Sequence, residues 1–191
     1  GWIQGTGYTG EKGVEIFVSN EEATSLWGAL LSHPYVIPVG LGARDTLRLE
    51  KGYLLSGQDF LWPGLNRESE ILPVGFLSRT TSQTAVPFGL DIDHEFIGRD
   101  GLVESMKSES TLWGLESLEK GPSPRPGHMV MRGNEESSEI IGYVTSGGPS
   151  PSKGMVGIAL AYLTNCENGE QVWVQSGRRR MRSEVKRPPF I

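Results

Sequence analysis

Cysteine and histidine are scarce in this chain of 191 residues. Cys166 is the single cysteine, so no internal disulfide can form, and such cysteine usage is typical of a reducing compartment. The three histidines, His33, His94 and His128, lie too far apart in the sequence to show the spacing of a metal site. We therefore expect no metal centre and a cytoplasmic location.

Long hydrophobic runs and an excess of positive charge are also missing. The apolar segment MVGIALAYL at 155–163 is much shorter than the roughly 20 residues that a membrane helix needs. The net charge of −5 at pH 7 argues against a general nucleic-acid surface. Glycine and proline are abundant instead, with 26 and 12 residues, which favours many turns and short strands over a helical bundle. We expect neither a membrane nor a nucleic acid among the partners.

Local patterns in the N-terminal part of the chain predict a mixture of strands and helices. Residues 6–18 alternate polar and apolar side chains around a glycine-flanked loop, which predicts a β-hairpin. Residues 19–33 place their apolar side chains on one helical face, and Ser19 with Glu22 forms a capping-box pattern at the start. The other predicted elements are a short strand at 36–40 and helices at 43–51 and 100–107.

The character of the sequence changes at about residue 110. Short apolar segments alternate there with Gly, Pro and Ser, which is typical of a small antiparallel barrel or sandwich. The segments are 111–118, 128–133, 139–148, 155–163 and 171–177. We therefore expect an α+β fold with a boundary near residue 106. The basic run Arg178–Arg180 could contact an acidic partner or ligand, or it could be a solvated strand end.

The predicted hairpin at 6–18 carries a carboxylate between apolar neighbours. A loop tip at Glu11 and Lys12 would place Tyr8 opposite Glu15, and paired residues share a face of a β-ribbon. That face would also include Phe17. Two aromatic rings beside a carboxylate could hold a flat heterocycle, because the rings stack and the carboxylate accepts two hydrogen bonds. The alternative is a solvated strand face with one stray phenylalanine.

Five segments of the chain resemble one known family when taken in this order and at these distances. They are GYTGEKGVEI at 7–16, PVGLGARDTLRLEKG at 38–52, FIGRDGL at 96–102, VTSGGPSPSKGMVGIALAYL at 144–163 and the terminal VKRPPF. The chain resembles the aminomethyltransferase (T-protein) of the glycine cleavage system, and it resembles only the C-terminal part of that family. The resemblance implies that residues 1–105 are the C-terminal portion of the folate-binding domain and that 106–191 form a C-terminal β-barrel domain.

The same resemblance implies an activity and its partners. The family transfers a methylene group from an aminomethyl-lipoyl arm on a carrier protein, the H-protein, to tetrahydrofolate and releases ammonia. The aspartate with the main catalytic role in the family belongs to an earlier segment, so we expect the enzyme to be incomplete here. We expect the N-terminal half of the enzyme to be a preceding segment of the same protein or a separate polypeptide. Without that half, we expect the chain to self-associate. In a eukaryote the implied location is the mitochondrial matrix.

The resemblance also implies three folate-binding residues, which are Tyr8, Glu15 and Arg44. Glu15 would pair with the amino and ring N–H donors of the pterin. The alternative for Arg44 is an exposed ion-pair surface shared with Arg48, since the two residues are four positions apart on a predicted helix.

One departure from the family pattern leaves a related function open, and one difference from a relative's motif counts against another. The chain has Gly89-Leu90 where the family usually has Gly-Trp, which keeps a folate-dependent demethylase-like relative as an alternative. A non-catalytic relative that acts in iron–sulfur protein maturation carries KGC-x-x-GQE. The matching stretch here is KGYLLSGQDF at 51–60, with Tyr53 in place of the cysteine, which counts against that function.

Overall fold

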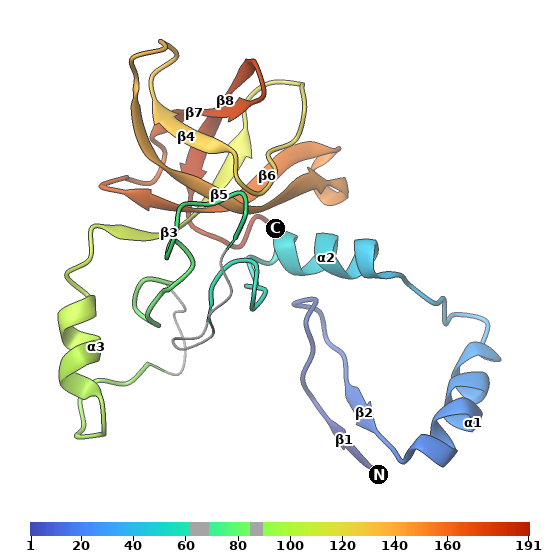
Figure 1. Cartoon of the computed structure of the whole chain (residues 1–191). Coiled ribbons are helices and arrows are strands. Elements are labelled where there is room, and N and C mark those ends of the chain that lie inside the picture. The colour runs from blue at the N-terminus through green and yellow to red at the C-terminus, as the bar shows by residue number, and fades with distance from the viewer. Residues whose placement is uncertain (62–68, 85–89) are drawn as a thin grey trace.

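The structure is a computed structural model that describes residues 1–61, 69–84 and 90–191 (Figure 1). Its C-terminal part is a closed antiparallel barrel with the strand order β3-β6-β5-β4-β7-β8. The strands are β3 Ser110–Ser117, β4 Met129–Arg132, β5 Glu139–Ser150, β6 Val156–Thr164, β7 Gln171–Ser176 and β8 Arg179–Lys186. The mixture of helices with this barrel confirms the predicted α+β fold class, and it decides for a barrel over a sandwich.

The last strand, β8, was not among the predicted apolar segments. It pairs with both β7 and β3 and so closes the barrel. Met181, Ser183 and Val185 are buried and alternate with more exposed polar residues. The inward face of β8 is therefore only partly apolar, and its outward face is rich in charge, which hides the strand from a search for apolar runs.

The barrel interior is filled by apolar side chains that alternate along the strands. Most of its members are less than 4% exposed, as expected where every strand sends each second residue inward. The cluster consists of Trp113, Leu115, Val130, Ile141, Val144, Ala159, Ala161, Leu163, Val172, Val174 and Val185. Among the described residues, every member of this core lies in β3 or later in the chain.

Helix α2, Leu41–Glu50, attaches the N-terminal part of the chain to the outside of the barrel. Leu49 packs in a second apolar cluster with Leu112, Ile158, Leu160, Tyr162 and Phe190. The helix begins two residues before the predicted range of 43–51 and ends as expected near Gly52, which has a φ of +74°. A Cβ atom on Gly52 would lie 2.3 Å from Cβ of Pro188, so the glycine also permits this close approach.

The first elements of the chain lie away from the barrel (Figure 1). They are the strands β1 Trp2–Gln4 and β2 Glu15–Phe17, which form a two-stranded ribbon, and helix α1 Asn20–Leu31. Helix α1 confirms the helix predicted at 19–33, and the Ser19 hydroxyl donates to the Glu22 carboxylate at 3.1 Å. Residues of α1 are all at least partly exposed, so its apolar face has no cover within the described residues.

The register of the N-terminal ribbon differs from the predicted hairpin. Glu15 pairs with Gln4, and residues 5–14 form a long loop in place of a tight turn. Tyr8 and Glu15 are therefore not cross-strand neighbours, and the predicted pairing was wrong. The loop also contacts a residue far along the chain: Lys51 forms an ion pair with Glu11 at 3.4 Å, and its side chain packs beside Gly10.

Two further segments complete the comparison with the predicted elements. Residues 36–40 form no strand, and Pro38 within them cannot donate a hydrogen bond to a ladder. Helix α3, Arg99–Ser105, confirms the short helix predicted at 100–107, and a 3-10 turn η1 at Pro151–Lys153 links β5 to β6. Within the described ranges, no helix has both the length and the apolar character to span a membrane.

Candidate functional site

Tyr8 lies at the centre of the candidate site, where the 5–14 loop meets α2 and the segment after it. Its hydroxyl donates a hydrogen bond to the carbonyl oxygen of Leu54 at 2.6 Å. The guanidinium carbon of Arg44 lies 4.8 Å from the centre of the Tyr8 ring, within the range of a cation–π interaction. Tyr53 stacks beside Tyr8, with ring centres 6.0 Å apart and an interplanar angle of 28°. The structure thus brings together two of the three predicted site residues, Tyr8 and Arg44.

The surroundings of Tyr8 keep its hydroxyl protonated. Burial raises the pKa of Tyr8 above its ordinary value. The charge of Arg48 lowers this pKa and the charge of Asp59 raises it, but the effect of burial is larger than either. A neutral phenol retains the proton that it donates to Leu54. The ring is half-buried, whereas Arg44 is exposed, so one charged group and one aromatic edge remain accessible to a ligand.

Glu15, the third predicted site residue, lies on β2 outside this cluster. It is exposed, and its carboxylate accepts a hydrogen bond from the hydroxyl of Thr6. A carboxylate held by a single hydroxyl keeps acceptor capacity for a further donor. The roles of Tyr8, Glu15 and Arg44 in folate binding stay predictions.

Arg48 is buried one helical turn after Arg44, which contradicts the alternative of an exposed ion-pair surface at Arg48. Its Nη1 atom donates to the Asp59 carboxylate at 2.7 Å and to the carbonyl of Tyr53 at 3.0 Å. Nε donates to Asp45 at 2.7 Å, and Nη2 donates to the Ser146 hydroxyl at 2.8 Å. Burial by itself would lower the pKa of Arg48, but the charges of Asp59 and Asp45 raise it.

Asp59 is the buried partner of Arg48, and it is fully surrounded by donors. Its carboxylate accepts the hydroxyls of Thr145 at 2.5 Å and Ser146 at 2.6 Å, and the backbone N–H of Leu55 at 2.9 Å. The β5–β6 register shifts between Val144 and Ser146, which marks a β-bulge at this point of β5. A bulge re-aims side chains, and here both hydroxyls reach the same carboxylate.

Asp59 was not among the predicted site residues, and no role was predicted for Thr145 and Ser146. The available signal was VTSGGPSP, which lies within one of the five segments that carry the family resemblance. Its Thr145 and Ser146 bind Asp59, and its Ser150 donates to Glu50 at 2.5 Å. The motif therefore attaches β5 to α2 and to the segment that follows it.

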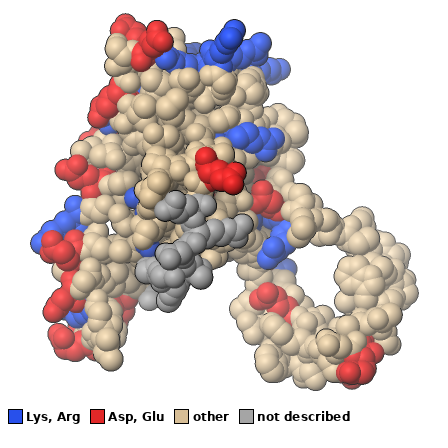
Figure 2. Space-filling model, in the orientation of Figure 1, with Lys and Arg blue, Asp and Glu red and all other residues tan. Residues whose placement is uncertain are grey.

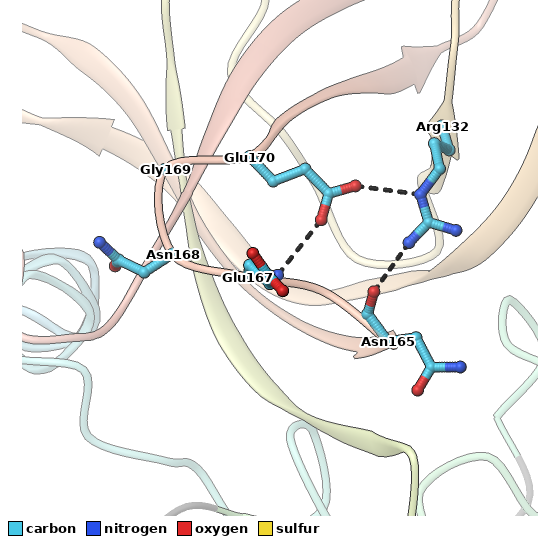
Figure 3. A pocket seen from close by; sticks show the side chains of 6 residues that line it. All are labelled: Arg132, Asn165, Glu167, Asn168, Gly169 and Glu170. Atoms are coloured by element: carbon cyan, nitrogen blue, oxygen red, sulfur yellow. Dashed lines mark hydrogen bonds and ion pairs between the residues drawn. The ribbon is translucent and has the colours of Figure 1, made fainter.

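A separate polar hollow lies at the end of the barrel where β6 turns into β7 (Figure 3). It has a volume of about 600 Å³ and is lined by Arg132, Asn165, Glu167, Asn168, Gly169 and Glu170. Arg132 donates to Glu170 at 3.0 Å, to Glu139 at 2.8 Å and to the Asn165 carbonyl at 2.9 Å. Its charge is thus already matched by carboxylates. Among the residues with a described position, no group of three or more His, Cys, Asp or Glu side chains could hold a metal ion.

Comparison with known proteins places this architecture in one family. The family model of the GCVT N-terminal domain matches residues 1–62, and that of the glycine cleavage T-protein C-terminal barrel domain matches residues 111–191. The aminomethyltransferase of Staphylococcus carnosus (strain TM300) is 38% identical over 185 residues, which cover 94% of this chain and 46% of the relative. This chain belongs to the glycine cleavage T-protein family.

Other T-proteins show the same extent of similarity. The aminomethyltransferase of Aquifex aeolicus (strain VF5) is 36% identical over 191 residues, which cover 99% of this chain and 48% of the relative. The crystal structure of glycine cleavage system aminomethyltransferase T from Bartonella henselae matches with a TM-score of 0.76 at 29% identity, covering 99% of this chain and 49% of that one. The chain thus spans about half the length of the T-proteins that it matches.

Two expectations within the T-protein comparison remain open. The division into 1–105 and 106–191 stays a prediction. The departure at Gly89-Leu90 falls partly on residue 89, which lies outside the described residues. Tyr53, which stands in place of the cysteine of the iron–sulfur maturation relative, takes part in the aromatic stack on Tyr8.

Proposed function

We propose that this chain forms the C-terminal half of a tetrahydrofolate-dependent aminomethyltransferase of the glycine cleavage system. The reaction is the transfer of a methylene group from the aminomethyl-lipoyl arm of the H-protein to tetrahydrofolate, with release of ammonia. The observation that carries the proposal is the cluster of Tyr8 and Arg44, two family-matched positions that come together at a half-buried place on the molecule. Membership of the T-protein family supports it.

The residues present fit a folate. The Tyr8 ring and the Arg44 guanidinium offer an aromatic surface and a cation, which suit a flat heterocycle with a carboxylate tail. Glu15 has acceptor capacity for the amino and ring N–H donors of a pterin. Bound tetrahydrofolate supplies the amine that accepts the one-carbon unit. The task of this chain is to bind and orient the ring and to keep water from it.

The remaining catalytic machinery belongs to the N-terminal half of the family's domain. The proton transfers of the reaction fall to the aspartate that the family carries there, and the H-protein docks on the complete enzyme. The proposed location is the cytoplasm, or the mitochondrial matrix in a eukaryote.

Calorimetry with tetrahydrofolate tests the proposal on the complete protein, with the N-terminal half supplied either as a preceding segment or as a second chain. Glu15→Ala should weaken binding by roughly 1.5–3 kcal/mol, the range for hydrogen bonds to a charged group. Glu136→Ala is the matched control, because Glu136 is an exposed carboxylate on the β4–β5 turn.

The outcomes separate the residue assignment from the function. If the complete protein binds tetrahydrofolate and Glu15→Ala binds it equally well, the role of Glu15 is wrong. If the complete protein does not bind tetrahydrofolate at all, the proposed function is wrong. Release of ammonia from an aminomethyl-lipoyl carrier then distinguishes aminomethyl transfer from demethylation of another donor.

A further inference from the structure

The buried ion pair of Arg48 and Asp59 connects three parts of the molecule. These are helix α2, the segment 53–59 and strand β5. Tyr8 depends on the first two of them, through Arg44 on α2 and through the carbonyl of Leu54. One ion pair therefore lies behind the contacts of the Tyr8 side chain with Leu54 and with Arg44.

The connection to α2 runs along one side of the helix. Arg44 and Arg48 are four positions apart, so their side chains project from the same face. Arg48 is held by Asp59 and Ser146, which lie outside the helix. A helix is stiff over one turn, so the fixed position of Arg48 also fixes the place from which Arg44 reaches the Tyr8 ring.

The connection to segment 53–59 acts on both neighbours of Leu54. Arg48 donates to the carbonyl of Tyr53 at 3.0 Å, and Asp59 accepts the N–H of Leu55 at 2.9 Å. Because the backbone is fixed on either side, the carbonyl of Leu54 points in a fixed direction. It accepts a hydrogen bond from the Tyr8 hydroxyl at 2.6 Å.

The connection to the barrel supplies the rigid support. Thr145 and Ser146 at the β5 bulge both donate to Asp59, and they lie 86 and 87 positions from it in the sequence. β5 is paired on both sides within a closed barrel. Asp59 is therefore anchored to a strand of the closed barrel.

The geometry points to Arg48 and Asp59 as positioning residues of the folate site, which hold Arg44 and the Leu54 carbonyl in place around Tyr8 without touching the ligand. The inference rests on the proposed function. A buried ion pair is weak evidence of stability, because apolar residues of similar size often stabilise a protein as well. A planar guanidinium that serves Asp45, Asp59, Tyr53 and Ser146 at once provides a defined geometry that apolar residues lack.

Arg48→Lys tests this inference in the complete protein. Lysine keeps the positive charge but cannot form all the hydrogen bonds of the guanidinium, so α2 and segment 53–59 are no longer held by the same side chain. We expect the Kd for tetrahydrofolate to rise about tenfold, which corresponds to about 1.4 kcal/mol of lost binding free energy. Arg132→Lys is the matched control. Arg132 also bridges two carboxylates, but it lies on β4, which carries none of the site residues, and its Kd should change by less than about twofold.

A double-mutant cycle with Tyr8→Phe separates positioning from general destabilisation. The phenylalanine removes the hydrogen bond to Leu54, which is one of the two contacts that Arg48 is inferred to place. If Arg48 acts through Tyr8, Arg48→Lys should raise the Kd less in the Tyr8→Phe background than in the wild type. A merely structural role of Arg48 would give equal increases in both backgrounds.

Ser146→Ala serves as the second variant in case Arg48→Lys does not fold. It deletes a hydroxyl that Arg48 and Asp59 share and leaves the ion pair in place. We expect a Kd increase of about threefold with a folded barrel by near-ultraviolet circular dichroism. If wild-type protein binds tetrahydrofolate and neither variant changes the Kd, the inference is overturned while the proposed function stands. Failure of the wild type to bind overturns the proposed function itself.

Discussion

Among single residues, Cys166 has chemistry that its surroundings determine. Burial raises the pKa of its thiol to about 11, and the charge of Glu170 also raises it, while Arg132 lowers it. A thiol reacts as its thiolate, so a pKa two units above the ordinary value leaves on the order of a hundredfold less reactive species near neutral pH. Cys166, the single cysteine of the chain, is therefore poorly reactive near neutral pH.

This gives a prediction for Glu170→Gln. Removing the negative charge lowers the pKa of Cys166 and releases Arg132 to lower it further, so the thiol should react faster with a disulfide reagent at pH 8. The gain should be about threefold for each unit of pKa, because the larger thiolate fraction is partly offset by the weaker nucleophilicity of a thiolate of lower pKa. The rate of colour release measures the effect. Glu167→Gln is the control on the same turn. Equal rates for wild type and Glu170→Gln would show that access to the thiol limits the reaction and not its charge state.

Among the secondary-structure elements, the end of α2 is tied to the end of β5 through Glu50. Its buried carboxylate accepts the Ser150 hydroxyl at 2.5 Å, the Ser152 hydroxyl at 2.8 Å and the Ser152 N–H at 3.0 Å. Burial by itself would raise the pKa of Glu50, but the hydrogen bonds from Ser150 and Ser152 outweigh it and hold the pKa below the ordinary value. The folded state therefore favours the ionised carboxylate.

The hydrogen bonds of Glu50 with Ser150 and Ser152 should make the free energy of unfolding depend on pH. A carboxyl with a lowered pKa stabilises the fold fully above its ordinary value of about 4.3, and the contribution is lost as the pH falls through the lower folded value. Glu50→Gln should reduce the free energy of unfolding by about 1.5–3 kcal/mol at pH 7, and the difference should shrink below about pH 4. Urea unfolding between pH 3 and 7 measures it, with Glu136→Gln as an exposed control. A difference that is constant with pH would contradict this role of Glu50.

At the scale of the whole molecule, apolar side chains are buried in the barrel but exposed in the N-terminal elements. Large apolar side chains are exposed throughout the first elements, and Figure 2 shows few charged groups in that part. They are Trp2, Ile3, Val14, Ile16, Phe17, Val18, Trp27, Leu30, Leu31, Tyr35, Val36, Ile37, Val39 and Leu41, here called the N-terminal apolar residues. Apolar surface of this extent is typical of an interface that another segment or chain covers.

We therefore expect the isolated 191-residue chain to self-associate. Size-exclusion chromatography should show species larger than the monomer mass of 20.9 kDa, increasing with concentration. Trp27→Glu, within the N-terminal apolar residues, should reduce the association. Ile97→Glu should not, because Ile97 is fully exposed just before α3 and outside this set. A compact monomer at all concentrations would contradict the expectation.

The sequence by itself determined the elements whose signals are local. The α1 helix follows from its capping residues and apolar face, and the barrel strands β3 to β7 follow from short apolar runs between turns, because such preferences act over a few residues. Family motifs also identified Tyr8 and Arg44, which the structure brings together.

Only the tertiary structure decided the contacts between distant segments. The 5–14 loop contacts Lys51 and Leu54, far along the chain, and does not form the tight hairpin that its glycines favour. Asp59 meets Ser146 across 87 positions and Glu50 meets Ser150 across 100 positions. No local pattern encodes such pairs, because they form only when the barrel bulge and helix α2 have been placed against each other.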